Sequence, residues 1–198
     1  YDTICLSGGG VSGISQLSAL NTLIKNKIIN LKNIKKFVAT SVGSIISLFI
    51  ILNYDIDEVL KFLVDLNLNS LVDNPNIDSL LYNYGINMID KILNIVKLFL
   101  HKKYNKYDIN FKELQSKFSK SIGIVGTNIT KSREEFFSIE TTPDMSVIKA
   151  IEISIAVPII FNAIKYKDCL YCDGALFNNF PINYCNKKKT LGITVHSL

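Results

Sequence analysis

The chain has no hydrophobic run long enough to cross a membrane. Its longest apolar stretches are 45–52, interrupted by Ser47, and 155–161, interrupted by Pro158. A membrane-spanning helix needs about 20 apolar residues. With 48% hydrophobic and 20% charged residues over 198 positions, the composition is that of a globular domain with a sizeable core. We therefore expect a single domain over 1–198, trimmed at its N-terminus because the chain begins with Tyr1.

Arginine is almost absent from the chain. Arg133 is the only arginine, and the sequence contains neither a zinc-ligand set nor an RNA-binding aromatic motif. These absences argue against a nucleic-acid partner, although the formal net charge is +5. Part of the basic excess is local: Lys97, Lys102, Lys103 and Lys106 around His101, and the run 187–189. We expect solvated faces there, and the alternative is attraction to an anionic membrane surface.

The chain has only four cysteines, which are Cys5, Cys169, Cys172 and Cys185. Cys169 and Cys172 form a C-x-x-C pattern inside an expected strand, where a spacing of three points the two thiols to opposite faces. We therefore expect buried or half-buried thiols rather than a redox or metal site. No Asp/Glu/His cluster has metal-ligand spacing, so no metal or other cofactor is expected. The free thiols fit a reducing compartment and hence an intracellular, cytoplasmic protein.

Expected strands and helices alternate along the chain. Strands are expected at 2–6, 34–40, 122–129, 135–139, 169–172 and 191–195, and helices at 14–28, 41–52, 56–66, 88–100, 111–118 and 146–155. The asparagine-rich stretch 67–87 reads as a loop or a broken helix. This alternation predicts an α/β fold with helices on the faces of a sheet.

Gly8, Gly9, Gly10 and Gly13 crowd into the turn that follows the apolar run 4–6. Such a turn exposes backbone N–H groups at a helix N-terminus, which is an anion site. A dinucleotide is disfavoured, because no acidic residue follows in 28–37 where that fingerprint needs one. A nucleoside triphosphate is disfavoured because no Gly-Lys-Ser/Thr follows. The remaining candidate anion is the oxyanion of a tetrahedral acyl-transfer intermediate.

An oxyanion site needs a nucleophile, and Ser41 is the candidate. It stands in Ala39-Thr-Ser-Val-Gly43, between an expected strand and an expected helix. The pattern is that of the G-x-S-x-G elbow, with Ala39 in the place of the first glycine. Alone, such a serine is more often a helix cap. Its place one strand–helix unit after the glycine turn favours the nucleophile.

The base that would activate this serine is open, because the chain has only two histidines. His101 lies in a basic stretch, and His196 follows the last expected strand. The order Ser41, Asp173, His196 fits an α/β-hydrolase triad, although that fold places several strands before its nucleophile. The alternative is a Ser–Asp dyad, in which the Asp173 carboxylate itself accepts the serine proton.

These segments together resemble the patatin-like phospholipase family. The resemblance rests on Ser7-Gly-Gly-Gly-Val-Ser-Gly13, Ala39-Thr-Ser-Val-Gly43 and Asp173-Gly-Ala175. It is extended by 150–161, similar to A-I-x-A-S-x-A-x-P-x-x-F, and by 173–181, similar to D-G-G-x-x-x-N-x-P. The resemblance covers nearly the whole chain. It implies a three-layer α/β/α fold with a central, mostly parallel sheet, and hydrolysis of lipid acyl esters without a cofactor.

The resemblance also implies roles for individual residues. Ser41 would be the nucleophile and form an acyl-enzyme, and Asp173 would be the general base and later the proton donor. The N–H groups of Gly9 and Gly10 would form the oxyanion hole. Positions that support the motifs are Gly8, Gly13, Ala39, Gly43, Gly174 and Ala175. Positions expected to be structural are Pro158, Phe161, Asn179 and Pro181.

Two positions depart from the family pattern. Ser12 stands where many members carry Lys or Arg, and Ala39 replaces a glycine. Phospholipids, neutral acylglycerols and other esters therefore stay open as substrates, as do acyl transfer to another lipid and a protein activator. A lipid-binding pseudoenzyme is the second hypothesis. Peripheral association with a membrane is expected, with 67–107 and its lysines as the candidate docking surface or, equally, as ordinary surface helices.

Overall fold

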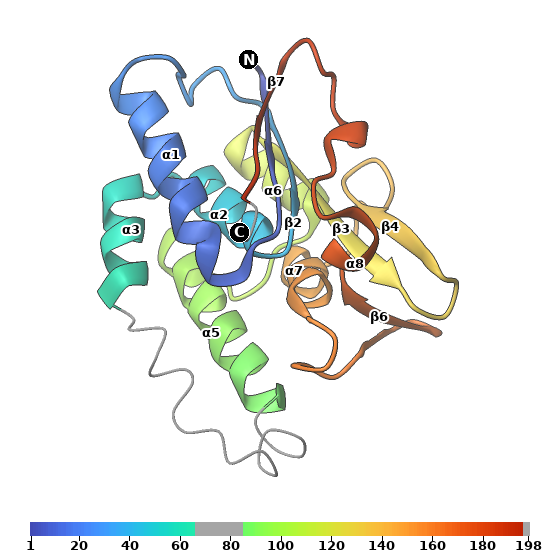
Figure 1. Ribbon diagram of the computed structural model, residues 1–198. Helices are drawn as coiled ribbons and strands as arrows, with labels where there is room; N and C mark the ends of the chain where they lie inside the picture. The colour runs from blue at the N-terminus through green and yellow to red at the C-terminus, as the bar shows by residue number, and fades with distance from the viewer. Residues whose placement is uncertain (66–84, 196–198) are drawn as a thin grey trace.

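The computed structural model describes residues 1–65 and 85–195, and its centre is one mixed sheet (Figure 1). The strands follow the order β5-β6-β3-β2-β1-β7, and β4 also pairs with β3. Their bounds are β1 (Thr3–Leu6), β2 (Lys36–Thr40), β3 (Ser121–Asn128), β4 (Arg133–Phe137), β5 (Ile164–Tyr166), β6 (Cys169–Asp173) and β7 (Thr190–Ile193). All eight residues of β3 are buried, which makes it the central strand of the sheet.

The sheet has a parallel half and an antiparallel half. β7, β1, β2 and β3 run parallel to one another, whereas β4 and β6 run antiparallel to β3, and β5 runs antiparallel to β6. The short connection 129–132 requires β4 to run antiparallel to β3, because a tight turn joins only antiparallel strands. The expected α/β fold with a helix-flanked sheet is confirmed, and its parallel part is the half that carries the glycine turn and Ser41.

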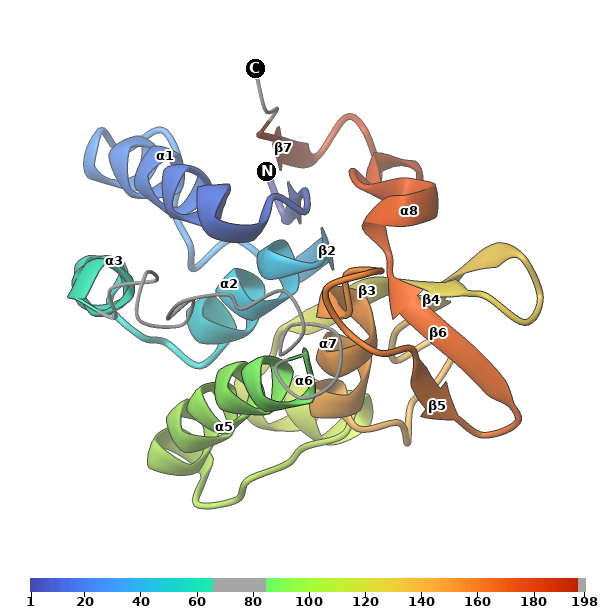
Figure 2. The ribbon, with the colours of Figure 1, turned by 60° about the horizontal axis from the view of Figure 1, so that its bottom comes forward.

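Most of the helices lie on one face of the sheet (Figure 2). The helices of the whole fold are α1 (Gly13–Lys25), α2 (Val42–Ile51), α3 (Ile56–Asp65), α5 (Gly85–Tyr104), α6 (Phe111–Phe118), α7 (Val147–Ile155) and α8 (Ala175–Asn178), with single turns at η1 (Gly10–Ser12) and η4 (Ile182–Tyr184). α2 packs on β2, and α7 packs on β3 and β6. Eight of the ten residues of α2 are buried, so this helix is part of the core.

The opposite face is covered by the segment that follows β6. Phe137 points to the α7 side, where a Cβ on Gly126 would meet Ile153 and Phe137. Its neighbour Phe136 therefore points to the other face. The ring of Tyr184, in η4, stacks on Phe136 with 4.1 Å between the ring centroids. Figure 2 places α8 on this second side of β3 and β4.

The helix expected at 111–118 has the predicted bounds, and the other expected elements differ from the observed ones by one to four residues at an end. That helix, α6, starts with a capping box in which Asn110 accepts from the Glu113 N–H. α5 starts three residues earlier than predicted, so 85–87 are helical within the stretch 67–87 that was expected to be a loop or a broken helix. The remaining residues of that stretch lie outside the described part of the chain. The short elements β5 and α8 were not predicted, because three or four residues are too few to show a hydrophobic period.

Gly43 lets the first turn of α2 lie against the end of β1. A Cβ at this position would lie 2.7 Å from the Ser7 carbonyl oxygen and 2.9 Å from the Leu6 carbonyl oxygen. Backbone atoms cannot move aside as a side chain can, so the close approach of α2 to β1 requires glycine.

We therefore expect Gly43→Ala to lower the free energy of unfolding by about 1–3 kcal/mol, because α2 must shift away from β1. Urea unfolding followed by circular dichroism measures the change. Ser15→Ala is the control, since Ser15 is exposed on α1 and an alanine there should change stability by no more than about 0.5 kcal/mol. Equal stability of the two variants would contradict the close packing.

Candidate active site

The candidate site lies at one end of the sheet, where three strands terminate. β1 leads into the glycine turn, β2 leads into Ser41, and β6 ends at Asp173. The register brings the last two together along one edge of β3, because Thr40 is opposite Val125 and Asp173 is opposite Gly126, the next residue of β3. β4 pairs with the other edge of β3. Segments that are more than 130 positions apart in sequence therefore meet at one place.

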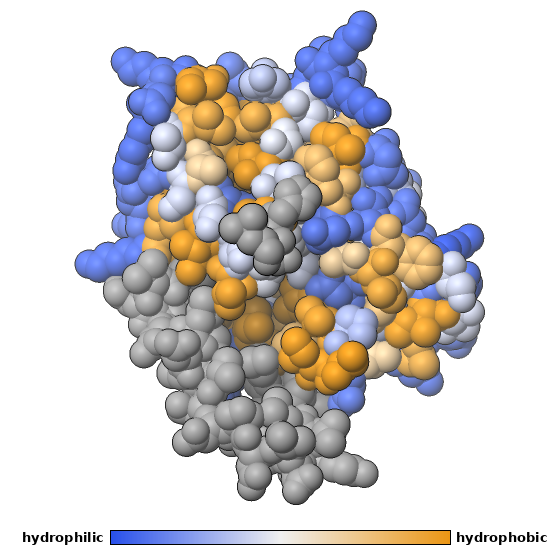
Figure 3. All heavy atoms as spheres, viewed as in Figure 1, coloured by the Kyte–Doolittle hydropathy of each residue, from blue (hydrophilic) through white to orange (hydrophobic). Residues whose placement is uncertain are grey.

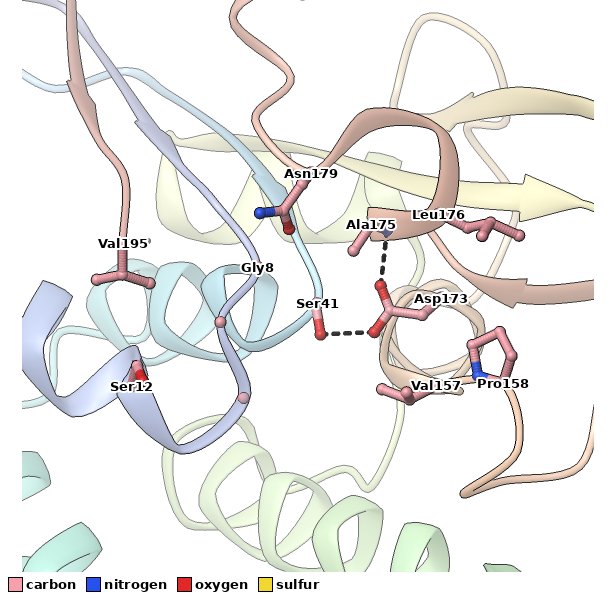
Figure 4. A pocket seen from close by; sticks show the side chains of 12 residues that line it. Gly8, Ser12, Ser41, Val157, Pro158, Asp173, Ala175, Leu176, Asn179 and Val195 are labelled. Atoms are coloured by element: carbon pink, nitrogen blue, oxygen red, sulfur yellow. Dashed lines mark hydrogen bonds between the residues drawn. The ribbon is translucent and has the colours of Figure 1, made fainter. Parts of the chain in front are cut away.

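Ser41 and Asp173 are joined by a direct hydrogen bond (Figure 4). The Ser41 hydroxyl donates to Asp173 Oδ2 at 2.7 Å, and the other carboxylate oxygen, Oδ1, accepts from the Ala175 N–H at 2.7 Å. The two side chains are almost fully buried, with Ser41 6% exposed and Asp173 2% exposed. The Ala175 bond fixes the carboxylate plane, so that the remaining oxygen faces the serine.

The backbone of Ser41 is held in an uncommon conformation. Its φ of 53° is positive, which non-glycine residues seldom adopt and which is typical of a serine displayed on a tight strand-to-helix turn. The Ser154 hydroxyl stabilises this turn, because it accepts from the Ser41 N–H at 2.8 Å and donates to the Val125 carbonyl at 2.6 Å. Ser154 thus ties α2, α7 and β3 together at the site. The sequence analysis gave it no role, and its place in the family-like segment 150–161 was the only signal.

Burial shifts the acidity of Asp173. Removal of the carboxyl group from water raises the pKa of Asp173, and the hydrogen bonds from the Ala175 N–H and the Ser41 hydroxyl lower it by less. Among the residues that the structure describes, no cationic side chain lines the cavity around it. The carboxylate is therefore more basic than an ordinary aspartate.

The glycine turn is attached to the end of β7 and to α1. The Ser7 hydroxyl donates to the Gly8 carbonyl and accepts from the Gln16 amide and from the Val195 N–H. The Gln16 amide also donates to the Ser7 carbonyl at 2.9 Å. These bonds hold the start of the turn against β7 on one side and α1 on the other. Gln16 and Ser7 are positioning residues that the sequence analysis did not single out.

Within the turn, Gly8 and its two successors differ in their hydrogen bonding. The Gly8 N–H donates to the Asn179 carbonyl at 3.0 Å. Within the described residues, no acceptor is bonded to the N–H of Gly9 or Gly10. Gly10 has a φ of 51°, which favours glycine. Two backbone donors are thus left available beside Ser41, and they are the two that the sequence analysis expected.

The remaining glycines of the motifs allow close packing around the site. A Cβ on Gly13 would lie 2.6 Å from Val42 at the start of α2, and one on Gly174 would lie 2.3 Å from the Val125 carbonyl oxygen. Ala39 is fully buried in β2, and Ala175 contributes the N–H that holds Asp173. The motif positions therefore support the site mainly through the backbone.

A cavity of about 530 Å³ opens over the two side chains. Its lining residues are Gly8, Gly9, Gly10, Ser12, Ser41, Val157, Pro158, Asp173, Ala175, Leu176, Asn179 and Val195. Figure 4 shows Val157, Pro158 and Leu176 on the Asp173 side, and Ser12 and Val195 beyond Ser41. Of the described lining residues, Asp173 is the only one with a charge. Pro158 and Asn179, which were expected to be structural, line the cavity as well.

His101 does not line the cavity. His101, in α5, stacks on Tyr107 with 4.2 Å between the ring centroids. His196 lies outside the described residues, so the triad that includes it stays an untested prediction. Within 1–65 and 85–195, no group of three or more His, Cys, Asp and Glu residues could hold a metal ion. No helix in the same ranges is long and apolar enough to cross a membrane. The four thiols are free and buried or half-buried, as expected.

We expect Ser154→Ala to lower the free energy of unfolding by about 1–3 kcal/mol, because the Ser41 N–H and the Val125 carbonyl lose their shared partner. Ser47→Ala is a matched control, since that buried hydroxyl bonds only to the Gly43 carbonyl of its own helix. Thermal and urea unfolding compare the two. A larger loss for Ser47→Ala would show that Ser154 does not support the turn.

The raised pKa of Asp173 predicts a pH-dependent stability. The unfolded chain releases this proton at lower pH than the folded chain, so the free energy of unfolding falls as pH rises from about 4 through the raised pKa. Asparagine cannot ionise; its oxygen can accept from the Ala175 N–H, and its NH2 can donate to the Ser41 hydroxyl. The melting temperature of Asp173→Asn, relative to wild type, should therefore rise with pH. A difference that shrinks with pH would contradict the raised pKa.

Comparison with known proteins gives consistent results. The family model described as patatin-like phospholipase matches residues 4–185. "Probable lipid hydrolase 463L" of Invertebrate iridescent virus 6 is 35% identical over 198 residues, covering 95% of this chain and 66% of the relative. "Uncharacterized protein R571" of Acanthamoeba polyphaga mimivirus is 31% identical over 195 residues, covering 96% of this chain and 64% of the relative. The chain thus spans slightly less than two thirds of the curated relatives it matches.

The fold is also that of a solved structure. VipD from Legionella pneumophila superimposes with a TM-score of 0.68 at 18% sequence identity, over 98% of this chain and 49% of VipD. The family model extends over most of the chain and includes the glycine turn, Ser41 and Asp173. The resemblance inferred from the sequence motifs is confirmed, and the chain belongs to the patatin-like phospholipase family.

Proposed function

We propose that the protein is a lipid acyl hydrolase, a phospholipase A-type esterase that uses a Ser41–Asp173 dyad. The observation that carries this proposal is the 2.7 Å hydrogen bond from the Ser41 hydroxyl to Asp173 Oδ2, at the base of a cavity that two free backbone N–H groups line. A dyad of this kind needs no histidine and no metal ion.

The first half of the reaction forms an acyl-enzyme. The ester carbonyl lies in the cavity, and Ser41 Oγ attacks its carbon while the Asp173 carboxylate accepts the hydroxyl proton. The carbonyl oxygen becomes negative and accepts hydrogen bonds from the Gly9 and Gly10 N–H groups. When the tetrahedral intermediate collapses, Asp173 returns the proton to the leaving alcohol. The acyl group is then bound to Ser41.

The second half repeats these proton transfers with water. Asp173 accepts a proton from the attacking water, the same two N–H groups hold the oxyanion, and the proton returns to Ser41 Oγ as the fatty acid leaves. The raised pKa of Asp173 supports its role as the base, because a more basic carboxylate is a better proton acceptor. If another lipid alcohol replaces water in this step, the product is a transferred acyl chain.

The cavity lining favours an acyl chain over a charged headgroup. Val157, Pro158 and Leu176 are apolar, and Ser12 stands where a cation would contact a phosphate. The lining therefore selects for the ester and its chain, and leaves phospholipids and neutral acylglycerols as substrates at a membrane surface. A protein activator and a cytoplasmic location remain part of the proposal.

The test is fatty-acid release from mixed phospholipid and acylglycerol vesicles. We expect Ser41→Ala and Asp173→Asn to lower the rate by about 10³-fold or more, because each removes one half of the dyad. His196→Ala and the exposed control Ser15→Ala should retain the wild-type rate. Wild type, but not Ser41→Ala, should also react with a fluorophosphonate probe.

Other outcomes point to the other hypotheses. Loss of activity in His196→Ala would indicate the Ser–Asp–His triad. A wild-type protein that neither releases fatty acid nor reacts with the probe would contradict the hydrolase and indicate the lipid-binding pseudoenzyme. The direct Ser41–Asp173 bond argues against that alternative, since a protein that only binds lipid has no need of it.

A further inference from the structure

Exposed apolar side chains gather around the mouth of the cavity. Among the described residues, eleven large hydrophobic side chains are exposed, and five of them line the cavity or lie within two positions of a lining residue. We call these five the apolar rim: Val11, Ile159, Ile160, Leu176 and Phe177. Figure 3 shows hydrophobic side chains gathered on this side of the molecule, where the end of α7, α8 and β6 lie.

The rim is assembled from three separate segments. Val11 belongs to η1 beside the glycine turn, Ile159 and Ile160 follow α7, and Leu176 and Phe177 belong to α8. Figure 4 shows Pro158 and Leu176 on one side of the dyad and Ser12 on the other. The fold therefore places exposed apolar groups on opposite sides of one opening, which a random scatter of surface side chains would not do.

Ile159 has the most unusual environment of the five. It is 98% exposed, and its φ of 74° lies in the left-handed region, which β-branched residues strongly disfavour. The turn is anchored at both ends, because the Phe161 N–H donates to the Val157 carbonyl at 2.9 Å and Phe161 packs on the core. Asparagine or glycine would suit this backbone better and would be more soluble. An isoleucine that is both strained and exposed indicates a functional constraint.

The lysine cluster near the end of α5 lies away from this opening. Lys103 bonds to the Asn53 carbonyl and covers the Tyr54 ring at 4.5 Å. These two residues follow the C-terminus of α2, a helix of ten residues, or about 15 Å, whose N-terminus is at Ser41. Lys106 is paired with Glu113. Among the described residues, no lysine of 85–107 and no other cationic side chain lines the cavity.

We propose that the apolar rim is the surface through which the protein enters a lipid layer, with Ile159 as its leading side chain. The occupant is the acyl region of a membrane, because the rim is continuous with a cavity suited to acyl chains and includes no charge. Insertion would place the ester next to Ser41 without the lipid first crossing water. The proposal rests on the proposed lipid hydrolase function. It places the docking surface at the cavity mouth and not at α5, which is part of the segment expected from the sequence.

The test compares Ile159→Asn with Ile28→Asn. Ile28 is also an exposed isoleucine, but it follows α1, whose thirteen residues separate it by about 20 Å of helix from the glycine turn. Binding to phosphatidylcholine vesicles, with and without added anionic lipid, is measured by co-sedimentation at low and high salt. We expect the affinity of Ile159→Asn for these vesicles to fall by at least about tenfold, because the variant no longer transfers one large aliphatic side chain from water into the lipid. Ile28→Asn should bind as wild type does.

Two further measurements separate insertion from a folding defect. Asparagine tolerates a positive φ, so the melting temperature of Ile159→Asn should equal or exceed that of wild type. Hydrolysis of a soluble short-chain ester should be unchanged, while fatty-acid release from vesicles falls. Phe177→Ser, on α8, should weaken vesicle binding as well, because it removes a rim side chain from another segment.

The outcomes distinguish this proposal from the hydrolase function on which it rests. If Ile159→Asn bound vesicles as tightly as the wild type, the rim proposal would be overturned. It would also be overturned if binding of the wild-type protein needed anionic lipid and disappeared at high salt, since that would indicate docking through the lysines. Absence of soluble-ester hydrolysis, with the vesicle binding pattern intact, would overturn the hydrolase and leave the rim in place.

Discussion

The site depends on one central strand, because β3 holds β2 and β6 at the separation and register that let Ser41 and Asp173 meet. Val125 is the critical position: it pairs with Thr40, its carbonyl accepts from Ser154, and it lies so close to Gly174 that only glycine fits there. A slip of one residue in either pairing would turn the side chains to opposite faces of the sheet. The geometry of the dyad is therefore a property of the sheet, and the loops only complete it.

The buried carboxylate connects function with stability. Desolvation makes Asp173 a better base, and the same desolvation disfavours its ionised form in the folded protein. Neither of its hydrogen bonds comes from a cation, so the charge is stabilised only by the Ala175 N–H and the Ser41 hydroxyl. Strain at Ser41 adds a second local cost. The extensive core around β3 and α2 offsets these terms, which explains why eight of the ten residues of α2 are buried.

The sequence was informative where local chemistry determines structure. The glycines at 8–13, the small residues around Ser41 and the Asp173-Gly-Ala175 turn are short-range signals, and they located the site. Ser154 and Gln16 could not be found in this way, because a buried hydroxyl or amide acquires its role from partners far away in sequence. The antiparallel placement of β6 and the short elements β5 and α8 likewise depend on tertiary pairing. The exposure and the left-handed backbone of Ile159 could not be predicted, since the dihedral angles of one residue leave no pattern in the sequence.

The position of β7 has a consequence for the synthesis of the chain. The first strand, β1, lies between β2 and β7, and the Val195 N–H bonds to the Ser7 hydroxyl at the start of the glycine turn. The earliest part of the site is therefore completed by the last strand described. A ribosome must release nearly the entire domain before the turn can take its final shape, and contacts of such long range fold slowly. The candidate site would thus stay incomplete while the chain is being made.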